Sequence, residues 1–111
     1  MTIESMLNGD VLVATLKGRM DAVTAPEFDA WFSARMQAGE KRLVLDMAGL
    51  DYISSAGLRS LLSAAKKLKA ADGAVVLCGL SGTVAEVFAM SGFMAIFTVV
   101  ATTAEAMSAM G

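Results

Sequence analysis

The stretch from Leu50 to Leu62, LDYISSAGLRSLL, decides the fold of this chain. It follows a short apolar run, Leu43 to Leu45, and leads into an Ala/Leu/Lys segment whose leucines recur at helical spacing. Two serines, an alanine and a glycine therefore lie where a strand is expected to pass into a helix. The first amide groups of a helix have no partner within the helix and carry the positive end of its dipole, so an oxygen or a phosphate is favoured at this point.

The serine pair has two interpretations. Serine is among the preferred N-cap residues, so Ser54 or Ser55 is expected to cap the helix. Because serine caps are common, spacing alone favours a cap over a reactive serine. The residues by themselves leave open which serine caps the helix and whether the other is a functional position.

Composition indicates one small domain whose apolar surplus suggests well-covered sheet faces or a surface kept for a partner. The chain has 111 residues, of which 56% are hydrophobic and 18% are charged. A chain of this length buries roughly 65% of its unfolded surface and needs no disulfide or metal to fold. The net charge is -2, and the sequence has no block of basic residues that could bind along the phosphate backbone of a nucleic acid. We therefore expect no direct nucleic-acid partner.

The sequence predicts a soluble, cytoplasmic protein. Cys78 is the only cysteine, which is typical of a reducing compartment. The chain does not begin with the pattern of a signal peptide. The longest uncharged run, from Val87 to Ala104, is interrupted by Ser91-Gly92 and diluted by threonines, so it predicts two soluble elements rather than a membrane span.

Outward from the central stretch, strands are expected to alternate with helices. Asn8-Gly9-Asp10 is typical of a hairpin turn, and Thr24 with Glu27 forms a capping-box pattern before a helix that ends near Gly39. Ala48-Gly49 predicts a turn after the third strand. We expect strands over 1–7, 11–16, 41–47, 74–78 and 96–100, and helices over about 24–39, 56–71, 83–90 and 102–110.

This order, β-β-α-β-α-β-α-β-α, predicts a single α/β domain over residues 1–111. A hairpin followed by alternating strands and helices implies a mixed, mostly parallel sheet of about five strands with about four helices and right-handed crossovers.

Residues suited to catalysis are scarce. The chain contains no histidine, so the commonest general base and zinc ligand is missing. Cys78 lies in an apolar strand without a cationic neighbour in sequence. Asp46 and Asp51 are close enough to suggest paired carboxylates, but nothing else supports acid–base chemistry. We therefore expect no enzyme activity, no metal site and no cofactor.

Three motifs carry a resemblance to a known family. They are LKGRMDAVTAPEF after the second strand, LVLDMAGLDYISSAGLRSLL in the middle, and VVLCGLSGTVAEVFAMSGF towards the end. With them the chain resembles the STAS domain, and specifically the bacterial anti-sigma factor antagonists, over essentially its whole length. The fold implied is the STAS fold.

The resemblance implies a partner switch without catalysis. In that family a serine of the pattern D-S-S/T-G-L is phosphorylated by a partner that is both an anti-sigma factor and a serine protein kinase. The matching position is Ser55, with Ser54 as the alternative site. The unmodified protein would bind the anti-sigma factor and free the sigma factor, and phosphorylation would end that binding. A metal-dependent serine phosphatase is the further partner implied.

The expected partner-binding surface surrounds this serine. Asp21 matches the family's acidic residue after the second strand and is expected beside it. The chain departs from the pattern at Ser54, where the family often has aspartate, and at Ala56, where a second hydroxyl often follows. The expected partner-binding residues are Asp21, Thr24, Ser54, Ser55, Ala56, Gly57, Leu58 and Ser81.

Other functions remain open from the sequence. A STAS domain that acts as a passive scaffold in a larger signalling complex would use Ser55 only as a cap. A receiver-like domain would accept a phosphoryl group on Asp46, although a late lysine is missing because none follows Lys69. The glycine-containing segment from Gly79 to Thr83 could touch a nucleotide phosphate, but an ordinary tight turn is the simpler interpretation.

Overall fold

One five-stranded mixed sheet organises the protein, and the computed structural model describes residues 1–111. Its strands lie in the order β1-β2-β3-β4-β5; β1 and β2 form an antiparallel hairpin, and the remaining neighbours are parallel. The elements are β1 (Thr2–Asn8), β2 (Val11–Met20), α1 (Ala25–Gln37), β3 (Arg42–Ile53), α2 (Ser55–Ala70), β4 (Ala74–Cys78), α3 (Gly82–Ser91), the 3-10 helix η1 (Phe93–Ala95), β5 (Thr98–Val100) and α4 (Thr103–Met110). The predicted α/β fold class and element order are confirmed.

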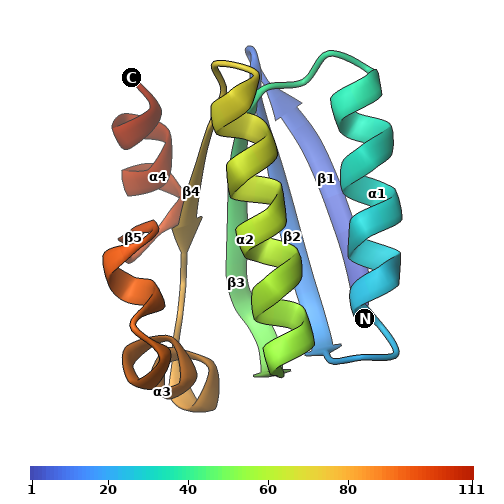
Figure 1. Cartoon of the computed structure of the whole chain (residues 1–111). Helices are drawn as coiled ribbons and strands as arrows, with labels where there is room; N and C mark the ends of the chain where they lie inside the picture. The colour runs from blue at the N-terminus through green and yellow to red at the C-terminus, as the bar shows by residue number, and fades with distance from the viewer.

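The helices divide between the two faces of the sheet. α1 and α2 lie side by side across one face, and α3 lies beyond the lower end of β4 (Figure 1). The alternate residues of β2 and β3 that point to this face join Phe28, Leu61 and Phe88 in the larger of two cores. On the opposite face α4 buries Ala106 against Val44, Val76 and Cys78. Helices therefore pack on both faces of the sheet, and on the second face α4 lies over β3, β4 and β5.

The third strand is longer than the sequence indicated. We expected it to end at Met47, with a turn at Ala48-Gly49, but β3 continues to Ile53. Gly49 pairs with Lys17, and a Cβ at Gly49 would lie 2.8 Å from Lys17 Cγ, so glycine lets the two strands stay together at a register shift. The prediction of a turn here was wrong, because Leu50 and Ile53 are buried and continue the alternation of the strand.

The end of the chain also differs from the expectation. The last strand was predicted from Ile96, but Phe93–Ala95 form η1 and β5 begins at Thr98. Phe97 turns into the core instead, where its ring lies 6.2 Å from that of Phe88 and 6.0 Å from that of Phe93. Burial of this aromatic cluster sets the path of the chain between α3 and β5.

None of the helices combines the length and apolar character needed to cross a membrane. The longest, α2, has 16 residues.

Candidate functional site

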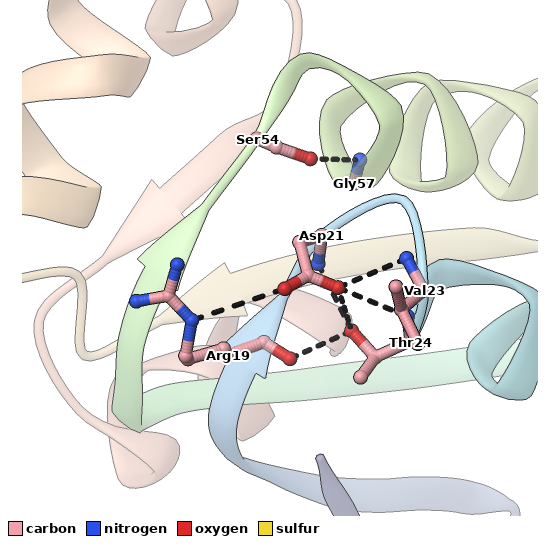
Figure 2. A network of polar contacts seen from close by, with 6 residues as sticks. All are labelled: Arg19, Asp21, Val23, Thr24, Ser54 and Gly57. Atoms are coloured by element: carbon pink, nitrogen blue, oxygen red, sulfur yellow. Dashed lines mark hydrogen bonds and ion pairs between the residues drawn. The ribbon is translucent and has the colours of Figure 1, made fainter.

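The two serines occupy different positions at the start of α2. Ser54 has an extended backbone and occupies the N-cap, and its Oγ accepts a hydrogen bond of 3.4 Å from the Gly57 amide (Figure 2). The Ser54 amide donates to the Met20 carbonyl at 2.9 Å, which ties the cap to the end of β2. Ser55 is the first residue of the helix, and it is exposed. The cap left open by the sequence is therefore Ser54.

The hydroxyl of Ser55 has no hydrogen-bond partner within the protein. At the first position of a helix its backbone amide is also one of the groups without an intrahelical partner. A group added to this oxygen would meet solvent on one side and the positive end of the helix dipole on the other. The position can accept a phosphate without loss of the cap.

Gly57 brings the start of α2 close to the sheet. A Cβ at this position would lie 2.8 Å from Ile53 Cγ1 and 2.9 Å from the Met20 carbonyl oxygen. Both distances are too short for a side chain, so glycine is required by the packing. Gly57 and Leu58 are buried, and their part in this region is to seat the helix on the sheet.

The loop after β2 lies beside this first turn of α2 and is held by the Asp21 carboxylate (Figure 2). Asp21 Oδ1 accepts hydrogen bonds from the amides of Val23 at 3.0 Å and Thr24 at 3.1 Å. The pKa of the Asp21 carboxyl is lowered below its ordinary value. The hydrogen bond from the Thr24 amide has the largest effect, followed by those from the Val23 amide and the Thr24 hydroxyl and by the charge of Arg19. The loop is therefore a turn closed by an ionised carboxylate.

Thr24 does not cap α1 through its side chain, contrary to the capping-box prediction. Its backbone is already helical, and its hydroxyl donates to the Arg19 carbonyl at 2.7 Å and accepts from the Asp21 amide at 2.9 Å. Thr24 Oγ1 also lies 3.2 Å from Asp21 Oδ1, so the hydroxyl closes the 21–24 loop instead.

Arg19 is a residue of this region that the sequence analysis missed. Its guanidinium carbon lies 4.3 Å from the centre of the Tyr52 ring, and its Nε lies 3.8 Å from Asp21 Oδ2. The parallel register pairs Arg19 with Tyr52 at the ends of β2 and β3. Only this register would have revealed the contact, since 33 positions separate the two residues in the numbering.

An open groove connects the 21–24 loop with α2. It has a volume of about 440 Å³ and runs between α1 and α2. Ala22 from the loop and Ala56 from the first turn of α2 both line it. The remaining lining residues come from the two helices: Ala25, Pro26, Asp29, Arg59, Ser60, Ser63 and Lys67.

Ser81 lies apart from this group of residues. It occupies the N-cap position of α3, where its side chain makes no capping hydrogen bond, and it is exposed. It follows β4, which ends opposite Asp46 in the middle of β3, whereas Ser54 follows the far end of β3. The structure thus brings together Asp21, Thr24 and the 54–58 segment, and no hydrogen bond joins Ser81 to them.

The two acidic residues considered for chemistry do not form a carboxylate pair with a common hydrogen bond. Asp46 lies inside β3 rather than at its end, and its Oδ1 accepts a hydrogen bond of 3.0 Å from the Ala48 amide. Asp51 is exposed. Burial, together with the nearby charge of Asp46, raises the pKa of the Cys78 thiol to about 11, so this thiol stays protonated. No group of three or more His, Cys, Asp or Glu side chains is placed to hold a metal ion.

These features define a small α/β domain with an exposed serine at a helix start and, beside it, a loop closed by hydrogen bonds to the Asp21 carboxylate. The family model of the STAS domain matches residues 2–106, and the chain belongs to the STAS domain family.

Relatives within this family are named as anti-sigma factor antagonists. The chain is 47% identical over 89 residues to BtrV of Bordetella bronchiseptica, to which that role is attributed; the match covers 80% of this chain and 77% of BtrV. It is 24% identical over 92 residues to the anti-sigma-B factor antagonist of Staphylococcus epidermidis, covering 83% of this chain and 85% of that protein.

Solved structures show the same fold. A Thermotoga maritima protein with the same attributed role superimposes with a TM-score of 0.92 at 19% identity, over 97% of this chain and 93% of the other. SpoIIAA in its unphosphorylated form superimposes with a TM-score of 0.75 at 20% identity, over 96% of each chain. The phosphorylated form of the Bacillus protein SpoIIAA gives 0.73 at 23% identity, over 96% of this chain and 97% of the other.

Proposed function

We propose that the protein is an anti-sigma factor antagonist that acts by partner switching at Ser55. In the unmodified form it binds an anti-sigma factor in the cytoplasm, and this binding frees the sigma factor for transcription. The anti-sigma factor is also a serine kinase, and its phosphorylation of Ser55 ends the complex. A metal-dependent serine phosphatase restores the unmodified form.

The observation that carries this proposal is that Ser54 caps α2 while the adjacent Ser55 leaves its hydroxyl free. Ser54 is half-buried and its oxygen is engaged by the Gly57 amide, whereas Ser55 is exposed and its hydroxyl is free. A kinase can reach Ser55 without breaking the cap. The 47% identity to BtrV, named for the same role, supports the choice of function.

The proposed surface combines Ser55 with the 21–24 loop. Asp21, Thr24, Ser54 and Ala56 flank it, Gly57 and Leu58 support it from below, and Ser81 extends it only if the partner reaches across to α3. Val23 is 82% exposed on a loop fixed by hydrogen bonds to Asp21, so it offers an ordered apolar contact. Such an anchor is typical of protein interfaces.

Phosphorylation would act on this surface through charge. In the transfer, Ser55 Oγ bonds to the γ-phosphorus of ATP, the bond from that phosphorus to the bridging oxygen breaks, and ADP leaves while the kinase takes the hydroxyl proton. A phosphoserine carries about -1.5 to -2 charges at neutral pH. At a helix start this charge is tolerated, but in an interface beside ionised Asp21 it is desolvated and repelled. The fold survives while the complex does not.

The test is to map phosphate on the protein recovered from its own cells, resting and stressed. We expect one phosphoryl group that appears and disappears on Ser55, its loss in Ser55→Ala, and its retention in Ser54→Ala. A group on Ser54 would contradict the assignment of the site. No modification under any condition would favour the passive scaffold.

A further inference from the structure

Arg59 lies one helical turn beyond Ser55 on the exposed side of α2. Residues four apart on a helix are neighbours, with Cβ atoms roughly 5–6 Å apart. Both side chains are exposed. Because long helical side chains lean toward the N-terminus of the helix, the guanidinium of Arg59 can reach the turn that holds Ser55.

No carboxylate pairs with Arg59 in the unmodified protein. Every ion pair within 4.0 Å uses another cation, namely Lys17, Arg19, Arg35 or Arg42. Asp29 from α1 lines the same groove as Arg59, but the two charged groups are not within that distance. A new anion near Ser55 would therefore find Arg59 without competition from an existing ion pair.

Two groups of opposite charge lie in the region around the start of α2. One is the Asp21 carboxylate of the 21–24 loop, whose Oδ1 accepts hydrogen bonds from the Val23 and Thr24 amides and whose Oδ2 lies 3.8 Å from Arg19 Nε. The loop carboxylate and the first turn of α2 lie close together in Figure 2. Arg59 lies one turn further along α2 and lines the same groove as Ala22 of the loop. By its charge, a phosphate on Ser55 would be repelled by the Asp21 carboxylate and attracted by the Arg59 guanidinium.

We propose that Arg59 is a positioning residue for phosphoserine at position 55: its guanidinium binds the phosphate across one turn of α2. The inference rests on the proposed function in taking Ser55 as the modified residue. Arginine suits this role because its planar guanidinium binds two phosphate oxygens at once, whereas lysine acts as a point charge.

The consequence is a phosphate that loses its second proton more readily. The second pKa of phosphoserine is ordinarily about 6. A cation held beside the phosphate stabilises the dianion and lowers this pKa. The modified protein then carries its full negative charge at neutral pH, at the place where the partner is proposed to bind.

The test installs phosphoserine at position 55 during protein synthesis and follows its titration by phosphorus-31 NMR. In Arg59→Gln the pKa of the phosphate should rise by roughly half a unit. Arg59→Lys should give an intermediate value. Lys66→Gln removes an equal charge on the same helix, ~16 Å from Ser55 along the axis, and should leave the pKa unchanged.

An unchanged phosphate pKa in Arg59→Gln would overturn the role of Arg59, as would an equal rise in Lys66→Gln. Arg59 is exposed, so the unmodified variant should melt like the parent. Because the phosphate is installed without a kinase, this result is independent of the switch. Failure of phosphate at Ser55 to weaken partner binding would refute the proposed function and leave the titration standing.

Discussion

At the scale of single residues, two adjacent serines have different roles because their backbone conformations differ. Ser54 must be extended to end β3 and its oxygen satisfies the Gly57 amide, whereas Ser55 already belongs to the helix. The sequence predicted a cap at this pair but could not choose between the two residues, because both are serine and serine suits the N-cap at either position. The choice depends on where β3 ends.

Ser54→Ala should lower the free energy of unfolding by about 1 kcal/mol, because it removes the side-chain cap of α2. Ser55→Ala is the matched control and should change it by less than about 0.5 kcal/mol, since its hydroxyl is exposed and unbonded. Urea unfolding monitored by circular dichroism measures both. Equal losses in the two variants would contradict the assignment of the cap.

Asp21 should make stability depend on pH in acid. Hydrogen bonds from the Thr24 and Val23 groups and the charge of Arg19 lower the pKa of its carboxyl in the folded protein. This contribution is therefore fully present above the unfolded pKa of about 3.9 and is lost as the pH falls through the lower folded value. Asp21→Asn should be less stable than the parent at pH 7, with the gap closing in acid.

Urea unfolding of both proteins at pH 7 and in acid, at one ionic strength, measures this gap. Because asparagine does not titrate in this range, any change in the gap reports on Asp21. A gap that keeps the same size at both pH values would show that the carboxylate charge does not stabilise the loop.

At the scale of elements, the contact between α2 and the end of β2 depends on Gly57. Gly57→Ala should destabilise the protein by about 1–3 kcal/mol, because the new methyl group overlaps Ile53 and the Met20 carbonyl. Helix propensity alone predicts the opposite sign, a gain of up to about 1 kcal/mol. Thermal unfolding of Gly57→Ala therefore distinguishes the packing clash from the propensity effect by the sign of the change in stability. A stabilised variant would refute the close packing.

The segment after β4 is held by an aromatic cluster. The Phe88 ring is fully buried and lies 6.1 Å from Phe93 and 6.2 Å from Phe97. Phe88→Ala should cost about 3–5 kcal/mol in the free energy of unfolding. Met90→Ala, in the same helix but 88% exposed, should change it by less than about 0.5 kcal/mol. Similar losses in both variants would contradict this account of the core.

The sequence predicted element types well and element ends poorly. Alternation and turn residues located the hairpin and the helices, because these signals are local. The continuation of β3 through Ala48-Gly49 depends on pairing with β2 around Lys17, which local sequence does not report. The same limit explains Thr24, whose hydroxyl bonds to Arg19 and Asp21, and the missed stacking of Arg19 on Tyr52.

At the scale of the whole molecule, the proposed switch changes a surface and leaves the fold in place. The core lies between the sheet and its helices, away from the exposed Ser55 hydroxyl. At the other end of the sheet Arg42 joins Asp10 Oδ1 at 2.9 Å and the Met110 carbonyl, which fastens the end of α4 to the hairpin. None of these contacts involves the region that the phosphate would occupy.

The most direct test of the central claim is the affinity of the protein for the anti-sigma factor of its own organism, with and without phosphate at Ser55. Calorimetry should show tight binding by the unmodified protein and a loss of at least about 100-fold with phosphoserine, since more than ~2.7 kcal/mol of desolvation and repulsion is expected at such an interface. The melting curves of the two forms should nearly coincide. Equal affinities in the two forms would contradict the partner switch.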